Sequence, residues 1–150
     1  MLEQVIVSLT GRSGPFRPFI HAALWASCLI FSPWQALASE RGDAVLLDMA
    51  AAFKKGDRKR LTQLLPQARG HALEPWAAYW ELRARLDEAS QGEIRDFLNR
   101  YPNTYQEDRL RNDWLLLLGQ RRDWAQFAEQ HPSYRMSDDK EVRCYALLID

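Results

Sequence analysis

Cysteine is scarce in this chain of 150 residues, which has only Cys28 and Cys144. Cys28 falls in a leader segment described below, so one thiol remains, and a single thiol cannot form an internal disulfide. This excludes a disulfide-stapled scaffold. Cys144 stands among Val142, Tyr145 and Ala146, a setting that favours a small buried core residue over a reactive nucleophile.

An excess of charge of either sign is also missing, because 20 basic residues face 20 acidic ones. A neutral, mixed surface gives no reason to expect nucleic acid or an anionic membrane as the main partner. Apolar residues make up 47% and charged residues 27%, and the length suits one domain. No stretch after Ala38 alternates apolar and polar residues as a half-buried strand does, so the pattern predicts an all-α fold.

Recurring catalytic and metal-binding motifs are lacking as well. The chain has no glycine-rich phosphate loop and no G-x-S-x-G elbow. His71 and His131 are far apart in the sequence and have no metal-ligand spacing with each other or with Cys144. We therefore expect no cofactor and no metal.

Acidic residues are plentiful, but their positions favour helix capping over catalysis. Hydrolysis of a glycoside needs two positioned carboxyl groups, or one acid with a group that stabilises positive charge. The acids here fall at helix starts or on polar helix faces, where caps and the helix dipole explain them. We predict no catalytic residue in this chain; the carboxylates considered are Glu93, Glu107, Asp123 and Asp138.

The basic run Lys54–Arg60 has two interpretations. The favoured one is a solvated corner between two helices, and the other is a small anion-binding patch.

The segment 1–38 has the pattern of a secretory signal peptide. Arg12 and Arg17 precede the apolar run Phe19–Phe31, and the small-residue sequence Ala36–Ala38 is followed by Ser39. A positive flank, an apolar stretch and an A-x-A end are typical of such signals. We predict cleavage between Ala38 and Ser39.

A lipoprotein anchor at Cys28 is the weaker alternative, because Trp25 stands where a small aliphatic residue is wanted. The apolar run is shorter than the roughly 20 residues that span a bilayer. We therefore expect no stable membrane anchor.

Helical spacing of apolar residues runs through residues 39–150. The first such pattern, Leu46 to Phe53, ends at Lys54-Lys55-Gly56. Asp57 can cap a second helix that Pro66 ends or kinks. Pro75 suits the first position of a third helix, in which Trp76, Tyr79 and Trp80 share one face.

Two capping boxes mark the next helix starts. Ser90 with Glu93 opens a fourth helix that Pro102 stops, and Thr104 with Glu107 opens a long helix. Gly119 and two arginines are expected to close that helix. Asp123 caps a short helix that ends before Pro132, and a last helix begins near residues 137–139 and is still running at Asp150.

The helices repeat weakly along the chain. Glu93–Pro102 matches Asp123–Pro132 at a spacing of 30 residues, and Leu61–Pro66 is a fainter copy. A period in the thirties with paired helices indicates an α-solenoid. Trp114 and Trp124 are in phase with the leucines of their helices, which favours packing between helices over stacking on sugar rings.

The predicted last helix has no glycine, proline or capping partner before Asp150. Because a terminal repeat needs a polar cap, we expect residues 39–150 to be part of a larger helical-repeat domain.

Five segments, in this order and spacing, resemble the start of the soluble lytic murein transglycosylases: Glu74–Arg83, Phe97–Pro102, Asp108–Gly119, Asp123–Phe127 and Val142–Ala146. The resemblance covers about residues 43–150. It implies a periplasmic protein whose long N-terminal region is a right-handed, TPR-like α-superhelix of helix pairs, with residues 39–150 as its opening arc.

In the family, a C-terminal lysozyme-like domain cleaves the peptidoglycan glycan between N-acetylmuramic acid and N-acetylglucosamine and forms a 1,6-anhydro product. A single glutamate of that domain acts as acid and then base, and it has no counterpart in this sequence. The resemblance therefore implies a scaffold that is inactive by itself and has peptidoglycan as its partner through the whole protein. The alternative is a self-contained periplasmic helical-repeat adaptor that binds a protein partner.

Overall fold

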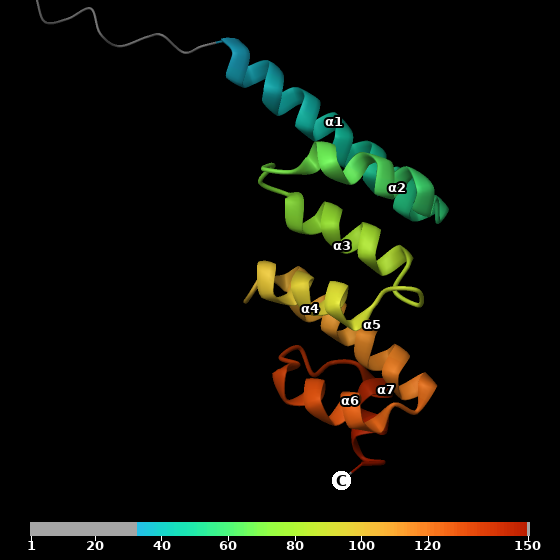
Figure 1. Cartoon of the computed structure of the whole chain (residues 1–150). Coiled ribbons are helices and arrows are strands. Elements are labelled where there is room, and N and C mark those ends of the chain that lie inside the picture. Colours follow the sequence, from blue (N-terminus) through green and yellow to red (C-terminus); the bar gives the residue numbers. More distant parts are fainter. Residues whose placement is uncertain (1–32, 150) are drawn as a thin grey trace, which may run out of the picture. The chain divides into compact units, whose positions relative to one another are not determined.

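A computed structural model describes residues 33–149, with side chains described from residue 41 onward. The signal-peptide prediction for residues 1–32 therefore lies outside the described residues. Within the described part there are seven α-helices, two short 3-10 helices and no strand, which confirms the all-α prediction (Figure 1). In chain order they are α1 (Pro33–Lys55), α2 (Arg58–Leu64), η1 (Leu65–Ala68), α3 (Glu74–Ala84), α4 (Gln91–Arg100), α5 (Tyr105–Arg121), α6 (Trp124–Gln130), η2 (His131–Ser133) and α7 (Lys140–Ala146).

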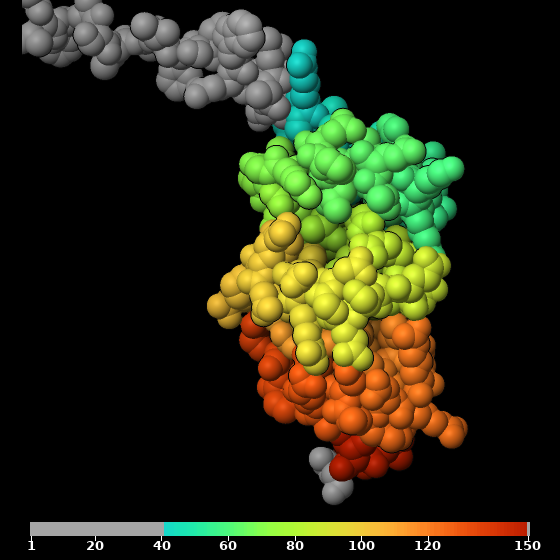
Figure 2. Space-filling view, in the orientation of Figure 1, coloured from blue at the N-terminus to red at the C-terminus, as the bar shows by residue number. Residues whose placement is uncertain are grey.

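The helices follow one another in a stack. Helix α1 contacts α3, α3 contacts α5 and α5 contacts α7, so the odd-numbered helices form a continuous series. Helix α2 packs on α1 and α3, while α4 and α6 both pack on α5. Figure 2 shows the same order on the surface, where α1–α2, α3–α4 and α5–α7 form successive bands. Each helix therefore buries its apolar face mainly against its near neighbours in the chain.

The first corner of the stack forms as the sequence predicts. Helix α1 ends at Lys55, and Gly56 takes the left-handed conformation (φ 69°) that glycine adopts without steric cost. The Asp57 carboxylate then accepts a hydrogen bond from the Arg60 backbone N–H at 3.0 Å and caps α2. Beneath this corner Met49 and Leu61 are fully buried.

The two early prolines act slightly differently from the prediction. Pro66 does not simply stop α2, because the chain tightens into η1 for one further turn. Pro75 is the second residue of α3, since Glu74 opens the helix and its carboxylate accepts the Gly70 backbone N–H at 2.7 Å. Either position suits proline, because both precede the first intrahelical donor.

One capping box is complete and the other is half formed. Ser90 Oγ accepts the Glu93 backbone N–H at 3.2 Å, and the Glu93 carboxylate accepts the Ser90 N–H at 2.9 Å. Thr104 accepts the Glu107 N–H at 3.1 Å, but the Glu107 carboxylate turns away to Arg111 and Arg135, at 2.6 and 2.7 Å. The second capping box therefore lacks the predicted hydrogen bond from the Thr104 backbone N–H to the Glu107 carboxylate, because two guanidinium groups outcompete one backbone N–H.

The prediction that Gly119 and two arginines close α5 is confirmed for the arginines and was wrong for the glycine. The helix runs on to Arg121, and Arg122 adopts the left-handed conformation (φ 58°) at its end. Gly119 instead lies in the helix directly under the ring of Tyr145 from α7, at a distance that leaves no room for a Cβ atom. This glycine is needed for close helix packing.

The last helix is shorter than predicted. Asp139 caps α7, which ends at Ala146, and residues 147–149 form turns. The N–H groups of Leu148 and Ile149 bond carbonyls three residues back, so the helix does not continue toward Asp150. Cys144 is exposed, which corrects its assignment to the core. The core face of α7 carries Val142 and Ala146, and Cys144 lies two residues from each, about 200° around the helix.

The buried apolar residues form two clusters. One lies mainly in α1, α2 and η1: Leu46, Met49, Ala52, Leu61, Leu64 and Ala68, joined by Ala77 of α3. The other extends from α3 to α7: Tyr79, Leu82, Leu86, Ile94, Phe97, Leu98, Leu110, Trp114, Leu115, Leu118, Phe127, Tyr134, Val142 and Ala146. Half-buried Trp80 packs against both clusters, so α3 is the element that joins them.

Candidate functional site

The carboxylates considered as catalytic candidates belong to different segments of the stack and serve structural roles. Glu93 closes the Ser90 capping box and also binds Arg85 at 2.6 Å; these partners lower its pKa to about 2, the Ser90 backbone N–H most strongly. Asp123 caps α6 by accepting the Gln126 N–H. Asp138 accepts the Tyr134 hydroxyl at 2.9 Å, and its neighbour Asp139 is the cap of α7. Each of these acids has a partner that explains its position.

Glu107 differs from the other candidates because it is buried, with 4% of its surface exposed. Its two oxygens lie 2.6 Å from Arg111 and 2.7 Å from Arg135, and Arg111 also donates to the Gln130 side chain at 2.8 Å. A buried carboxylate paired with two guanidinium groups suits a structural clamp. It ties α5 to the end of α6 and to the segment before α7.

A whole polar stripe of α5 is buried in this way, and the sequence reading missed it. Asp108 accepts the backbone N–H groups of Arg135 and Met136 at 2.9 and 2.7 Å, which holds the segment between η2 and α7. Asp113 accepts the Tyr79 hydroxyl at 2.8 Å and pairs with Arg83 at 2.9 Å. In the sequence, the only sign of this stripe was the high number of charged residues in α5. Their burial becomes visible only when the neighbouring helices are in place.

The buried Asp113 changes the titration of its phenol partner. Burial, followed by the adjacent carboxylate and its hydrogen bond, raises the pKa of Tyr79 to about 12. A neutral tyrosine donating to a carboxylate is a stable pair at ordinary pH. The pair joins α3 to α5.

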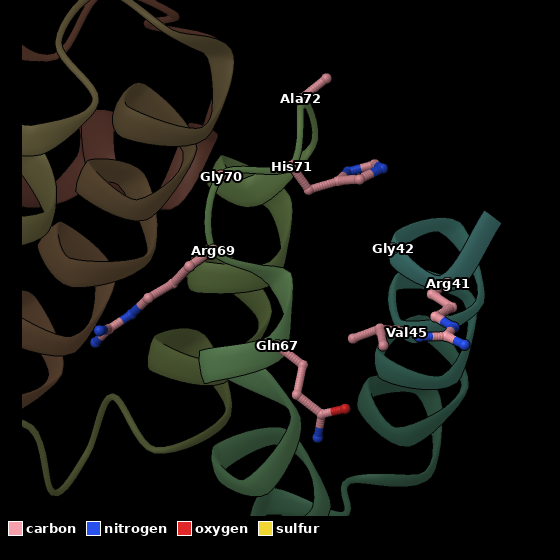
Figure 3. A pocket seen from close by; sticks show the side chains of 8 residues that line it. All are labelled: Arg41, Gly42, Val45, Gln67, Arg69, Gly70, His71 and Ala72. Carbon is pink, nitrogen blue, oxygen red and sulfur yellow. The ribbon is translucent and has the colours of Figure 1, made fainter. Parts of the chain in front are cut away.

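A hollow of about 620 Å³ lies between α1 and the segment 67–72 (Figure 3). Val45 and Gln67 line it from opposite sides, and His71 points toward α1, whereas Arg69 points away from the hollow. His71 is fully engaged: Nε2 lies 2.9 Å from Asp43, and Nδ1 accepts the Leu73 backbone N–H at 3.0 Å. The hollow therefore offers no free imidazole.

The second histidine serves packing. His131 begins η2, and its ring stacks on Phe127 with centroids 5.5 Å apart and planes inclined by 16°. It lies in another part of the stack from His71, and Cys144 is on an exposed helix face. Among the described residues no group of histidine, cysteine and acidic side chains is placed to hold a metal ion.

The basic run Lys54–Arg60 is exposed throughout, as expected for a solvated corner. Arg58 pairs with Asp87 and Glu88 at 3.2 and 2.7 Å, and Arg60 pairs with Asp48. Acidic neighbours thus engage two of the arginines.

A row of aromatic rings crosses three helices on the stack. It consists of Phe53 on α1, Trp80 and Trp76 on α3, and Tyr105 on α5, and we call these residues the aromatic row. Successive ring centroids lie 6.3, 5.8 and 5.7 Å apart. The first three rings are half-buried, and 54% of Tyr105 is exposed.

The other two described tryptophans serve packing, as predicted. Trp114 is 2% exposed within the larger cluster. Trp124 packs against Phe127 and Tyr145, with centroids 6.4 and 6.0 Å apart.

The predicted cleavage site lies at the start of the described chain. Helix α1 begins at Pro33 and includes the backbone of Ala38 and Ser39. None of the described helices is both long and apolar enough to span a bilayer.

Comparison of the sequence with protein-family models, with curated proteins and with solved structures gives no match in any of the three.

Proposed function

We propose that this chain is the exported N-terminal scaffold of a peptidoglycan lytic transglycosylase. Residues 39–150 would form the opening arc of a right-handed α-superhelix, and a signal peptide cleaved after Ala38 would direct it to the periplasm. Cleavage of the glycan to a 1,6-anhydro product belongs, in this proposal, to a lysozyme-like domain that this sequence does not contain. The chain by itself is inactive.

The observation that supports the proposal most is where the resembling segments lie. Glu74–Arg83 is most of α3, Asp108–Gly119 is most of α5 and Val142–Ala146 is the end of α7. These three helices contact one another in sequence, and the two shorter segments lie on the helices that pack on α5. The resemblance therefore follows the packing elements of one continuous helical stack.

The chemistry of the described side chains agrees with a scaffold role. Acidic residues that could serve catalysis are occupied as caps or in ion pairs, namely Glu93, Glu107, Asp123 and Asp138. A solenoid of paired helices commonly presents a long surface to another molecule.

Reading the gene downstream of codon 150 tests the proposal. Continued helical repeats followed by a lysozyme-like domain, directly or after a frameshift, are expected. Expression of that longer product should release 1,6-anhydro muropeptides from purified sacculi, detected by mass spectrometry, whereas residues 1–150 should release none. Absence of any such domain removes the transglycosylase assignment.

The exposed apolar residues after α7 favour a second candidate function, a periplasmic adaptor that binds a protein. Leu147 and Leu148 are 75% and 69% exposed, and exposed leucines beside a helical stack are typical of protein contacts. Thermal melting of residues 39–150 distinguishes the two functions. A cooperative, monomeric transition supports the self-contained adaptor, while aggregation or a non-cooperative transition supports a part of a longer superhelix.

A further inference from the structure

The cleavage site of the proposed signal peptide lies inside a helix. Helix α1 begins at Pro33, so the backbone of Ala38 and Ser39 belongs to its second turn. A peptidase binds the chain around the scissile bond in an extended conformation, because backbone N–H and C=O groups there pair with the enzyme. In an α-helix these groups are already bonded to one another. Folding and cleavage therefore compete for the same stretch of backbone.

Helical hydrogen bonds connect the cleavage site to the turn that follows it. In an α-helix each N–H donates to the carbonyl four residues back. The N–H of Gly42 is therefore bonded to the carbonyl of Ala38, and the N–H of Asp43 to that of Ser39. The cleavage site can open only as far as Gly42 and Asp43 allow these bonds to break.

His71 holds this following turn from outside the helix. Its Nε2 lies 2.9 Å from the Asp43 carboxylate, and its ring is so close to Gly42 that an added Cβ would lie 2.8 Å from Cδ2. The ring points toward α1 (Figure 3). Its Nδ1 accepts the Leu73 backbone N–H at 3.0 Å, and only 16% of the side chain is exposed. His71 thus contacts the two residues that bond back to the cleavage site.

The contact with His71 extends the supported part of α1. Among the side chains that the structure describes, those of α1 are buried at Leu46, Met49 and Ala52. The end of a helix that nothing supports opens easily, because each turn depends on the turn beside it. The His71 contact lies about one turn before Leu46, so it fixes the turn to which the cleavage site is bonded.

We propose that folding of the stack closes the Ala38–Ser39 bond to signal peptidase and that His71 is the residue that locks it. Cleavage then has to precede the docking of α1 on the segment 67–72. The reaction is hydrolysis of the peptide bond by water, which leaves a carboxylate on Ala38 and a free amine on Ser39. This inference rests on the proposed function for the cleavage site and adds the order of events.

Cleavage by purified signal peptidase tests the proposal. The substrates are the folded full chain in mild detergent and a synthetic peptide of residues 24–45, and mass spectrometry follows the products. The peptide should be cut between Ala38 and Ser39, and the folded chain at least about tenfold more slowly, because only its opened fraction is a substrate. Equal rates overturn the inference and leave the export proposal intact. A peptide that is not cut removes the cleavage site, and with it both proposals.

Substitution of Glu40 opens the site while the rest of the helix remains. Proline is accepted at the start of a helix but forces the residue before it into an extended conformation. In Glu40→Pro the helix should therefore begin at residue 40, and the folded variant should be cut about as fast as the peptide. Glu40→Ala removes the same charge, keeps the helix and should be as resistant as the parent. Equal resistance of the two variants would show that the helix is not the protecting element.

Substitution of His71 tests the lock itself. His71→Ala should raise the cleavage rate of the folded chain about two- to twelvefold, the range for loss of one hydrogen bond, because the rate follows the opened fraction. His131→Ala is the matched control, since His131 stacks on Phe127 in another part of the stack and should leave the rate unchanged. An unchanged rate in His71→Ala overturns the role of His71. Circular dichroism spectra that match the parent ensure that each variant is folded.

Discussion

The two apolar clusters of the stack contain different kinds of side chain. The N-terminal block, residues 33–68, is held by aliphatic side chains such as Met49 and Leu61. The C-terminal block, residues 74–146, adds aromatic rings and a buried stripe of charged residues on α5. Aliphatic packing is tolerant of small shifts, whereas buried ion pairs are costly unless every partner is in place.

The difference implies unequal cooperativity along the chain. The blocks are joined through α3, which packs on α1, α2 and η1: Phe53 stacks on Trp80, Ala77 is buried in the N-terminal cluster, and Thr62 donates to Glu81 at 3.0 Å. In stacked helical arrays, stability is close to a sum of local units and their interfaces. We therefore expect the N-terminal block to open without the C-terminal block, while the C-terminal block unfolds as one unit.

The largest effect is expected from Phe127→Ala. Phe127 is 0% exposed and packs against Trp124, His131 and Tyr145, so its loss leaves a cavity between α6, η2 and α7. The free energy of unfolding should fall by about 3–5 kcal/mol. Urea denaturation measures the change, and hydrogen exchange should quicken throughout residues 74–146.

Leu61→Ala is the matched change in the other block, because Leu61 is also 0% exposed. Its faster exchange should be confined to α1, α2 and η1. If α5 to α7 exchange faster to the same extent, the two blocks form a single cooperative unit and the comparison fails.

Gly119→Ala should disturb the contact between α5 and α7. Alanine is the better helix former by about 1 kcal/mol, but its Cβ would meet the Tyr145 ring, and overpacking of this kind costs about 1–3 kcal/mol. A net loss of stability is expected in thermal melts. Gly92→Ala is the control, because only Ser90 Oγ lies near, at 3.8 Å, and the change should be neutral or slightly stabilising. Equal melting temperatures for the two variants would show that α7 docks loosely.

Tyr79→Phe tests the link between α3 and α5. Removal of the hydroxyl leaves the buried Asp113 with one partner fewer, which should cost about 1–3 kcal/mol at neutral pH. The folded pKa of Tyr79 is about 12 against an ordinary value of 10.0, so the parent should lose stability as pH rises from about 10 to about 12.

The variant should lose less stability over that alkaline range than the parent does. Some loss should persist, because burial and the Asp138 carboxylate raise the pKa of Tyr134 to about 12 as well. An unchanged alkaline titration of stability in Tyr79→Phe would contradict the buried hydrogen bond.

The smallest effect belongs to an exposed cap at the start of α4. Ser90→Ala removes one half of the capping box and should cost about 1 kcal/mol in a chemical denaturation at neutral pH. The pKa of Glu93 is lowered from 4.5 to about 2, so its contribution is complete above pH 4.5 and is lost as pH falls toward 2. Glu93→Gln should flatten that acid loss; an equally steep loss in the variant would assign it to other carboxylates.

Local features of this fold were predictable from the sequence. Helix starts at Asp57, Ser90 and Asp123 follow from side chains that cap their own helix within its first turn. The corner at Gly56 and the stop before Pro102 depend on backbone geometry alone. Such interactions need no partner from elsewhere in the chain.

Residues whose role depends on a neighbouring helix were the ones misjudged. Glu107 has a capping sequence but pairs with Arg135, which lies beyond α6 and η2 in the chain. Gly119 was expected to end its helix, but it makes room for the ring of Tyr145. Cys144 has apolar neighbours in the sequence, but it faces solvent. The aromatic row likewise combines three helices, so no single segment indicated it.

The sequence by itself thus determined the class of the fold, the order of the helices and most of their boundaries, because capping and helical periodicity act within one or two turns. The tertiary structure alone decided which charges of α5 are buried, which glycine permits close packing and which rings meet at the surface. The physical reason is that burial and pairing are properties of two surfaces in contact, and each helix encodes only one of them.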